Sequence, residues 1–130
     1  MKFLDPGVRA VITRVKAGTP VELEVEVRTT EATKVNGHRY DVFVERGDLR
    51  ICAGFTIHDR KSVIIEGTKS WPYDIAPGLV VTDRAAITEL DVKKALSELG
   101  PGSEPRYLVQ VTVDVDGTPV PVKAEAYFTP

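Results

Sequence analysis

The strongest constraint on the fold is a strict alternation of apolar and charged residues near the N-terminus. Val21, Leu23, Val25 and Val27 alternate with three glutamates and Arg28. A period of two is that of a β-strand with one buried and one solvated face. We expect the glutamate row to face solvent rather than to bind a metal, because a straight strand spaces such residues about 7 Å apart. The chain must therefore build a sheet with one covered face.

Other segments extend this sheet. A β-branched run over residues 8–15, bounded by Pro-Gly and Gly-Thr-Pro, predicts a strand before the alternating one. Asn36-Gly37 predicts a tight hairpin after it, because both central residues of such a turn need positive φ. A turn at Arg46-Gly47 and a loop over 58–62 would complete a four-stranded antiparallel meander from about residue 20 to 66.

The turns also predict a register. The pairs expected across the second hairpin share one apolar face and are Val44 with Leu49, Val42 with Ile51, Tyr40 with Ala53, and His38 with Phe55. The same register has Ile57 facing Val63 and Phe55 facing Ile65 in the next hairpin. It places Cys52 on the opposite face from His38, which argues against a Cys-His nucleophile pair.

The second half contains a loop, a helix and a hairpin. Residues 67–78 have turn residues and no period, so they predict the longest loop, before a short strand over 79–81. A helix is expected over about 88–99, with Thr88 as N-cap and Gly100-Pro101 at its end. Its buried stripe comprises Val92, Ala95, Leu96 and Leu99.

A second hairpin is expected at the C-terminal end. Alternating residues over 107–115 lead to an Asp116-Gly117 turn, which would pair Val113 with Val120. Pro119 and Pro121 would then occupy non-hydrogen-bonded positions, and the last strand would be a sheet edge because proline cannot donate to a further strand.

Composition sets the class. With 130 residues, 42% of them hydrophobic, and no apolar run near the roughly 18 residues of a membrane span, we expect one domain over 1–130. About eight strands and one helix predict a mainly β (α+β) fold. It would be an antiparallel sandwich or a partly open barrel, with the helix packed against it. A net charge of −2 and a pI of 5.7 argue against a general nucleic-acid binder.

The compartment follows from the cysteine content and the N-terminus. One cysteine allows no internal disulfide and no thiolate zinc cluster, and the first residues lack the apolar stretch of a signal peptide. We therefore expect a cytoplasmic or virion protein. A single Asn and a single Gln among many Glu, Lys, Arg and Pro are typical of thermophile proteins, and equally of GC-rich coding.

Candidate binding residues lie in three places. Trp71 and Tyr73 flank Pro72 in the long loop and predict either an interface anchor or a cover over the core. Arg60 and Lys61 would contact an acidic partner or phosphate from a hairpin tip. The edge that carries Pro119 and Pro121 would be a docking element.

These features favour a non-enzymatic structural or assembly subunit, and we expect it to be a homo-oligomer such as a virion, shell or ring component. Its partners would be further copies of itself or other protein subunits. The alternative is a small-ligand binder or small enzyme with its site inside a barrel. Its candidate residues would be His58, Asp59, Tyr73 and Arg106. No phosphate loop, nucleophile elbow, paired-cysteine or EF-hand motif occurs, so we predict no catalytic residue, cofactor or metal, and neither a nucleic-acid nor a membrane partner.

Overall fold

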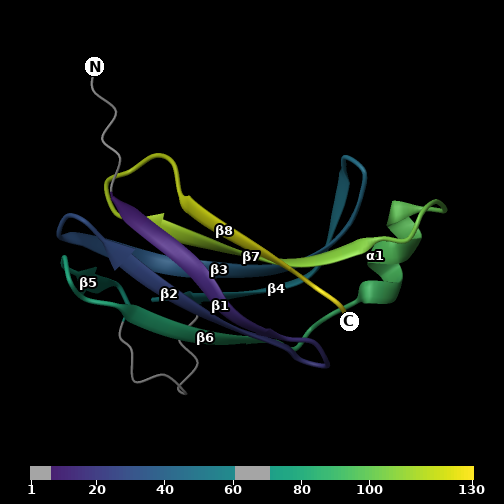
Figure 1. The fold of residues 1–130 in the computed structure, drawn as a ribbon, viewed down its shortest axis with the longest axis horizontal. Coiled ribbons are helices and arrows are strands. Elements are labelled where there is room, and N and C mark those ends of the chain that lie inside the picture. Colours follow the sequence, from purple (N-terminus) through teal and green to yellow (C-terminus); the bar gives the residue numbers. More distant parts are fainter. Residues whose placement is uncertain (1–6, 61–70) are drawn as a thin grey trace.

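The computed structural model describes residues 7–60 and 71–130, which form two antiparallel sheets packed face to face (Figure 1). The smaller sheet has three strands in the order β1-β2-β6. Their bounds are β1 Val8–Lys16, β2 Val21–Thr29 and β6 Val81–Ile87. The alternating segment is the central strand β2, whose apolar residues are buried as the sequence predicts.

The larger sheet has five strands, four of them in the order β4-β3-β7-β8, while the short β5 pairs with the start of β3. Their bounds are β3 Thr33–Arg46, β4 Leu49–Asp59, β5 Tyr73–Ile75, β7 Arg106–Val115 and β8 Val122–Phe128. Strand β1 packs beside β8, and β6 beside β4. The sheets do not close into a barrel, and the predicted mainly β fold, a sandwich with one helix, is confirmed.

The core between the sheets consists largely of valine. β-branched residues suit the pleated surface of a strand, which explains why the chain uses so many of them. Fully buried valines come from both sheets and include Val8, Val25, Val27, Val35, Val42, Val44, Val109, Val111 and Val113. No helix of the described ranges is long and apolar enough to cross a bilayer.

The prediction of a hairpin at Asn36-Gly37 is wrong. Strands β2 and β3 belong to different sheets, so the meander is not formed, and β3 runs straight through both residues. The register of β3 with β7 shifts there, and Asn36 Nδ2 donates to Asp116 Oδ1 at 3.3 Å. A Cβ on Gly37 would lie 2.9 Å from the Asp59 Cβ, so glycine serves a close approach of β4 rather than a turn.

The predicted β3–β4 register is also wrong. The turn lies at residues 47–48, so Val44 pairs with Ile51, and a bulge near Gly54 then shifts the pairing by one residue. Phe55 therefore faces outward, and His58 pairs with His38 on the inner face. Strand β4 continues through Asp59, where a loop was expected. The pairings predicted for Val63 and Ile65 lie outside the described residues.

The bulge has a tertiary cause. A Cβ on Gly54 would collide with the carbonyl oxygen of Glu89, and the Asp91 N–H donates to the Ala53 carbonyl at 2.8 Å. The segment that leads into the helix thus lies directly on β4.

Helix α1 spans Val92–Leu99. Its N-cap is Asp91, which accepts a hydrogen bond from the Lys94 N–H at 2.9 Å, and not Thr88. The start is later than predicted because the residues before Asp91 lie extended against β4, where Glu89 approaches Gly54 and the Asp91 N–H donates to the Ala53 carbonyl. The predicted end at Gly100 is confirmed, where φ is 80° and the N–H bonds to the Leu96 carbonyl.

Two other boundaries differ from the prediction. The expected short strand over 79–81 is instead the longer β6, and β5 lies in the expected loop. In the last hairpin Val113 pairs with Val122 instead of Val120, so Pro119 and Pro121 lie in the connection and not in a strand. Strand β8 is nevertheless the end of its sheet.

Candidate functional site

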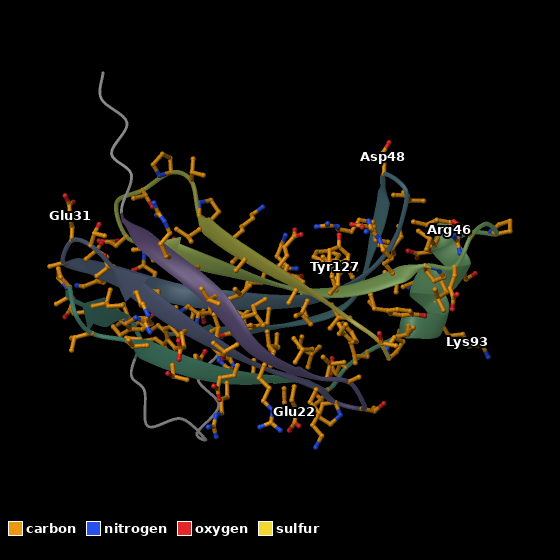
Figure 2. All side chains as sticks on the ribbon, in the orientation of Figure 1. Glu22, Glu31, Arg46, Asp48, Lys93 and Tyr127 are labelled. Atoms are coloured by element: carbon orange, nitrogen blue, oxygen red, sulfur yellow. The ribbon has the colours of Figure 1, made fainter. Side chains whose placement is uncertain are left out.

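The outer face of the five-stranded sheet carries a network of hydrogen bonds and ion pairs together with stacked arginine and aromatic side chains. Tyr127 on this sheet and Glu22 on the other point away from the sandwich on opposite sides (Figure 2). The outward residues follow from the register of β3 with its neighbours. They are Arg39, Asp41, Phe43 and Glu45 on β3, Arg50, Cys52 and Phe55 on β4, Arg106, Leu108 and Gln110 on β7, and Glu125 and Tyr127 on β8.

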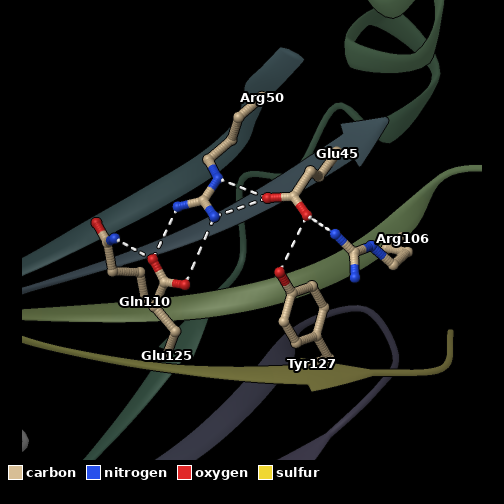
Figure 3. A network of polar contacts seen from close by, with 6 residues as sticks. All are labelled: Glu45, Arg50, Arg106, Gln110, Glu125 and Tyr127. Atoms are coloured by element: carbon tan, nitrogen blue, oxygen red, sulfur yellow. Dashed lines mark hydrogen bonds and ion pairs between the residues drawn. The ribbon is translucent and has the colours of Figure 1, made fainter. Parts of the chain in front are cut away.

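One carboxylate lies at the centre of this face (Figure 3). Glu45 accepts hydrogen bonds from Arg50 at 2.7 and 3.0 Å, from Arg106 at 2.5 Å and from the Tyr127 hydroxyl at 3.0 Å. Arg50 also donates to Glu125 at 2.8 Å, and so does Gln110 at 2.8 Å. The network joins all four main strands of the sheet.

These contacts determine the charge of the carboxyls. Hydrogen bonds from Arg50 and Tyr127 hold the pKa of Glu45 below its usual range. Hydrogen bonds from Arg50 and Gln110 do the same to the pKa of Glu125, and the two carboxylates raise the pKa of Arg50. Both carboxyls are therefore ionised at neutral pH. Glu45 is screened from water by the arginine and tyrosine side chains above the sheet.

Three arginines stack on aromatic rings of this same face. The guanidinium carbon lies 4.3 Å from the ring centre for Arg39 over Phe55, 5.3 Å for Arg50 over Phe43, and 4.7 Å for Arg106 over Tyr127. We call this surface the arginine–aromatic face, defined by these six residues. Leu108 also lies on the arginine–aromatic face. Its side chain points away from the core between the sheets, yet its neighbours on this face bury it fully.

The outer face of the three-stranded sheet is quite different. It carries simple ion pairs, such as Lys16 with Glu22 at 3.8 Å and Arg84 with the half-buried Glu24 at 2.8 Å. The Arg84 side chain is 82% exposed. The glutamate row of β2 thus lies on an ordinary solvated surface.

A second polar cluster lies between the sheets, where β6 faces β3 and β4. Asp83 on β6 is its centre. Its Oδ2 accepts from the Tyr40 hydroxyl at 2.5 Å, and lies 2.9 Å from His58 Nδ1 and 3.1 Å from His38 Nδ1. These three partners all belong to the other sheet.

Aromatic side chains complete this cluster. The Tyr73 hydroxyl lies 2.7 Å from His38 Nε2, and the Trp71 ring packs edge-on against His38 with centres 4.9 Å apart. Both nitrogens of His38 are thus engaged, and its side chain is fully buried.

The electrostatics of Asp83 set the protonation of its neighbours. Burial alone would raise the pKa of Asp83, but hydrogen bonds from His38, His58 and Tyr40 outweigh it and hold that pKa far below its usual range. The same burial and the Asp83 charge raise the pKa of Tyr40 and of Tyr73. Because an ionised carboxylate only accepts, both histidines must carry a proton on Nδ1.

The structure brings together three of the sequence-predicted site residues. Trp71, Tyr73 and His58 meet in the Asp83 cluster. Asp59 follows on the other face of β4, beside Gly37, and Arg106 lies on the arginine–aromatic face. The predicted ligand set therefore does not converge.

The remaining predicted residues lie apart. Arg60 is exposed directly after β4, Lys61 lies outside the described residues, and Pro119 and Pro121 are exposed in the β7–β8 connection. Cys52 lies on the arginine–aromatic face, where burial raises its thiol pKa. Among the described residues no group of three His, Cys, Asp or Glu side chains could hold a metal ion.

Sequence reasoning missed Asp83 and assigned His38 to a hairpin end. The strand that carries Asp83 shows only a weak apolar period. Asp83 is also distant in sequence from both histidines, so no local pattern indicates that they meet. The charged residues of β3 alternate visibly with the apolar ones, so the outward face of β3 was within reach of sequence reasoning.

Comparison with known proteins gives a fold and no family. No protein-family model matches the sequence, and no curated protein matches it. Spo0M, the sporulation control protein from Bacillus subtilis, is similar in structure, with a TM-score of 0.56 and 13% identity over 93% of this chain and 47% of that chain.

Two further structures match less well. A protein from Archaeoglobus fulgidus has a TM-score of 0.43 and 14% identity over 95% of this chain and 96% of its own. A β-glucosidase from Kluyveromyces marxianus has a TM-score of 0.39 and 14% identity over 95% of this chain and 14% of its own. The chain thus spans under half the length of Spo0M, which it resembles in fold alone.

Proposed function

We propose that this chain is a non-enzymatic assembly subunit that binds another protein surface through its arginine–aromatic face. The observation that carries the proposal is the set of three arginine–aromatic stacks on one sheet face. Arginine and aromatic residues are enriched at protein interfaces and at their hot spots, whereas lysine is depleted. A cytoplasmic or virion setting belongs to the same proposal.

The exposure of the face supports this role. Phe55 is 50% exposed and Tyr127 is 51% exposed, so both rings present apolar area to a partner. Neighbouring carboxylates hold the arginines in place, so little side-chain entropy remains to be lost on binding. A preorganised face of this kind is suited to docking.

The first test is native mass spectrometry of the protein purified from its source without added ligands, with a denatured control. We expect a complex with a second protein chain, either another copy or a different subunit. Tyr127→Ser should abolish that complex, whereas Arg84→Ser, which removes an exposed residue of the other sheet face, should leave it intact. A bare monomer, or a complex that Tyr127→Ser does not affect, would refute the proposal.

A second candidate function, a small-ligand or enzyme site, is favoured by one observation. His58 is 28% exposed on its side chain and anchors its Nδ1 proton on the ionised Asp83, which leaves Nε2 as the basic nitrogen. Catalytic histidines are oriented in this way. A small molecule that co-purifies with the wild type and is lost in His58→Gln would favour this function.

A further inference from the structure

The Asp83 cluster contains a chain of hydrogen bonds that leads from a phenol to a buried carboxylate. The Tyr73 hydroxyl lies 2.7 Å from His38 Nε2, and His38 Nδ1 lies 3.1 Å from Asp83 Oδ2. Because His38 carries a proton on Nδ1 and donates it toward Asp83, Nε2 of the neutral ring has the lone pair, and the Tyr73 hydroxyl donates to it. The Tyr73 proton therefore has an oriented base within hydrogen-bond distance.

Trp71 connects this chain to the protein surface. Its ring centre lies 5.2 Å from that of Tyr73 and 4.9 Å from that of His38. The Trp71 side chain is half-buried, whereas that of His38 is fully buried. Indoles and phenols are among the side chains that give up single electrons to radicals, and an oxidised indole takes an electron from a phenol whose proton can leave. Trp71 is the only tryptophan of the chain.

The buried charge of the cluster favours the loss of an electron from Tyr73. Asp83 is ionised, and above about pH 7 histidine is ordinarily neutral, so its described hydrogen-bond partners then carry no charge. An anion without a cation beside it is costly away from water. When Tyr73 loses an electron and passes its proton to His38, an imidazolium forms next to Asp83 and cancels that charge. A proton transfer from Tyr40 to Asp83 would instead remove the acceptor of both histidine N–H groups.

We propose that Trp71, Tyr73 and His38 form a one-electron redox site that quenches oxidising radicals of the peroxyl class. The peroxyl radical takes an electron from Trp71 and, with a proton from water, becomes a hydroperoxide. Trp71 recovers an electron from Tyr73, the Tyr73 O–H proton moves to His38 Nε2, and a neutral tyrosyl radical remains. In total one electron passes from Tyr73 to the peroxyl radical. The site is separate from the arginine–aromatic face and does not depend on the proposed docking function.

Pulse radiolysis of the purified full chain with azidyl radicals tests the proposal, because azidyl radicals oxidise tryptophan in preference to protonated phenols. At about pH 8 the tryptophanyl absorption should decay while a tyrosyl absorption grows, at a rate independent of protein concentration. The control is the same chain unfolded in urea, where Trp71 and Tyr73 stay two residues apart but Tyr73 has lost His38. We expect the transfer to be about tenfold or more slower in urea.

Three variants locate the radical and its base. Tyr73→Phe keeps the ring and removes the proton, so it should abolish the tyrosyl signal. Tyr107→Phe, the matched control, removes a hydroxyl outside the Asp83 cluster and should leave the transfer unchanged. Asp83→Asn should slow the transfer, because the His38 imidazolium then lacks its anion, and circular dichroism confirms that the variant is folded.

Four results would each overturn the inference. They are a wild type without a tyrosyl signal, a tyrosyl signal that survives in Tyr73→Phe, equal rates in the folded and the unfolded chain, and equal rates in folded Asp83→Asn and the wild type. The comparison in urea needs no substitution, so the inference stays open to refutation even where a variant does not fold.

Discussion

Replacing Asp83 with asparagine should loosen the connection between the two sheets. Asp83 is the member of its cluster that comes from the three-stranded sheet, and its Oδ2 accepts three hydrogen bonds from Tyr40, His38 and His58. Asparagine has the same size and one acceptor oxygen but no charge. The change therefore isolates the charge of the carboxylate from its volume.

The magnitude follows from the three bonds. A hydrogen bond to a charged group contributes about 1.5–3 kcal/mol, against about 0.5–1.5 kcal/mol for a neutral one. If each bond loses about 1 kcal/mol, Asp83→Asn lowers the free energy of unfolding by about 3 kcal/mol. Total stabilities of domains are about 5–15 kcal/mol, so the loss is large.

Urea denaturation followed by circular dichroism measures this loss as a lower midpoint at an unchanged slope. Asp48→Asn is the matched control, because Asp48 is exposed at the tip of the β3–β4 hairpin (Figure 2). A free energy of unfolding for Asp83→Asn within about 0.5 kcal/mol of the wild type would refute the argument, since surface substitutions change it by that much.

The same reasoning gives a pH dependence. The pKa of Asp83 lies far below its usual range in the folded state and is about 3.9 in the unfolded chain. Its contribution to stability is therefore fully present above about pH 4 and is lost as the pH falls through the folded-state pKa. In acid, the stability of the wild type should fall more steeply than that of Asp83→Asn. Parallel curves below pH 4 would contradict this.

Three further substitutions test the packing, each by the urea midpoint. Gly54→Ala should cost about 2 kcal/mol, because its methyl group meets the Glu89 carbonyl, and a neutral effect would show that the bulge adapts. Asp91→Ala should cost about 1 kcal/mol by removing the N-cap of α1, and no loss would place the cap elsewhere. Leu108→Ala should cost about 3 kcal/mol although Leu108 points away from the core, whereas Leu79→Ala should be nearly neutral. Equal effects of these two would mean that the arginine–aromatic face is open to water.

Local sequence patterns predicted the class and much of the secondary structure. The alternation in β2 identified a half-buried strand, and the apolar stripe with Gly100 identified α1 and its end. These features depend on the period of a side-chain pattern or on the conformation of one residue. Both can be read within a few residues of the chain.

The pairing of strands could not be read in this way. Asn36-Gly37 has the composition of a hairpin turn, yet β3 continues through both residues. Glycine is needed at position 37 because Asp59 of the neighbouring strand lies too close for a side chain there. The Trp71, Tyr73 and His58 side chains were visible in the sequence as candidates. Their common partner Asp83 was not, because it arrives from the other sheet.

The sequence by itself thus determined that β2 is a strand with one buried face, through its period, and where the helix ends. Only the tertiary structure decided which strands pair and which side chains share a face. The physical reason lies at Gly54, where the segment before α1 packs on β4 and shifts the register by one residue. A shift of one residue turns every later side chain to the other face, which brings His58 inward to Asp83 and Phe55 outward to Arg39.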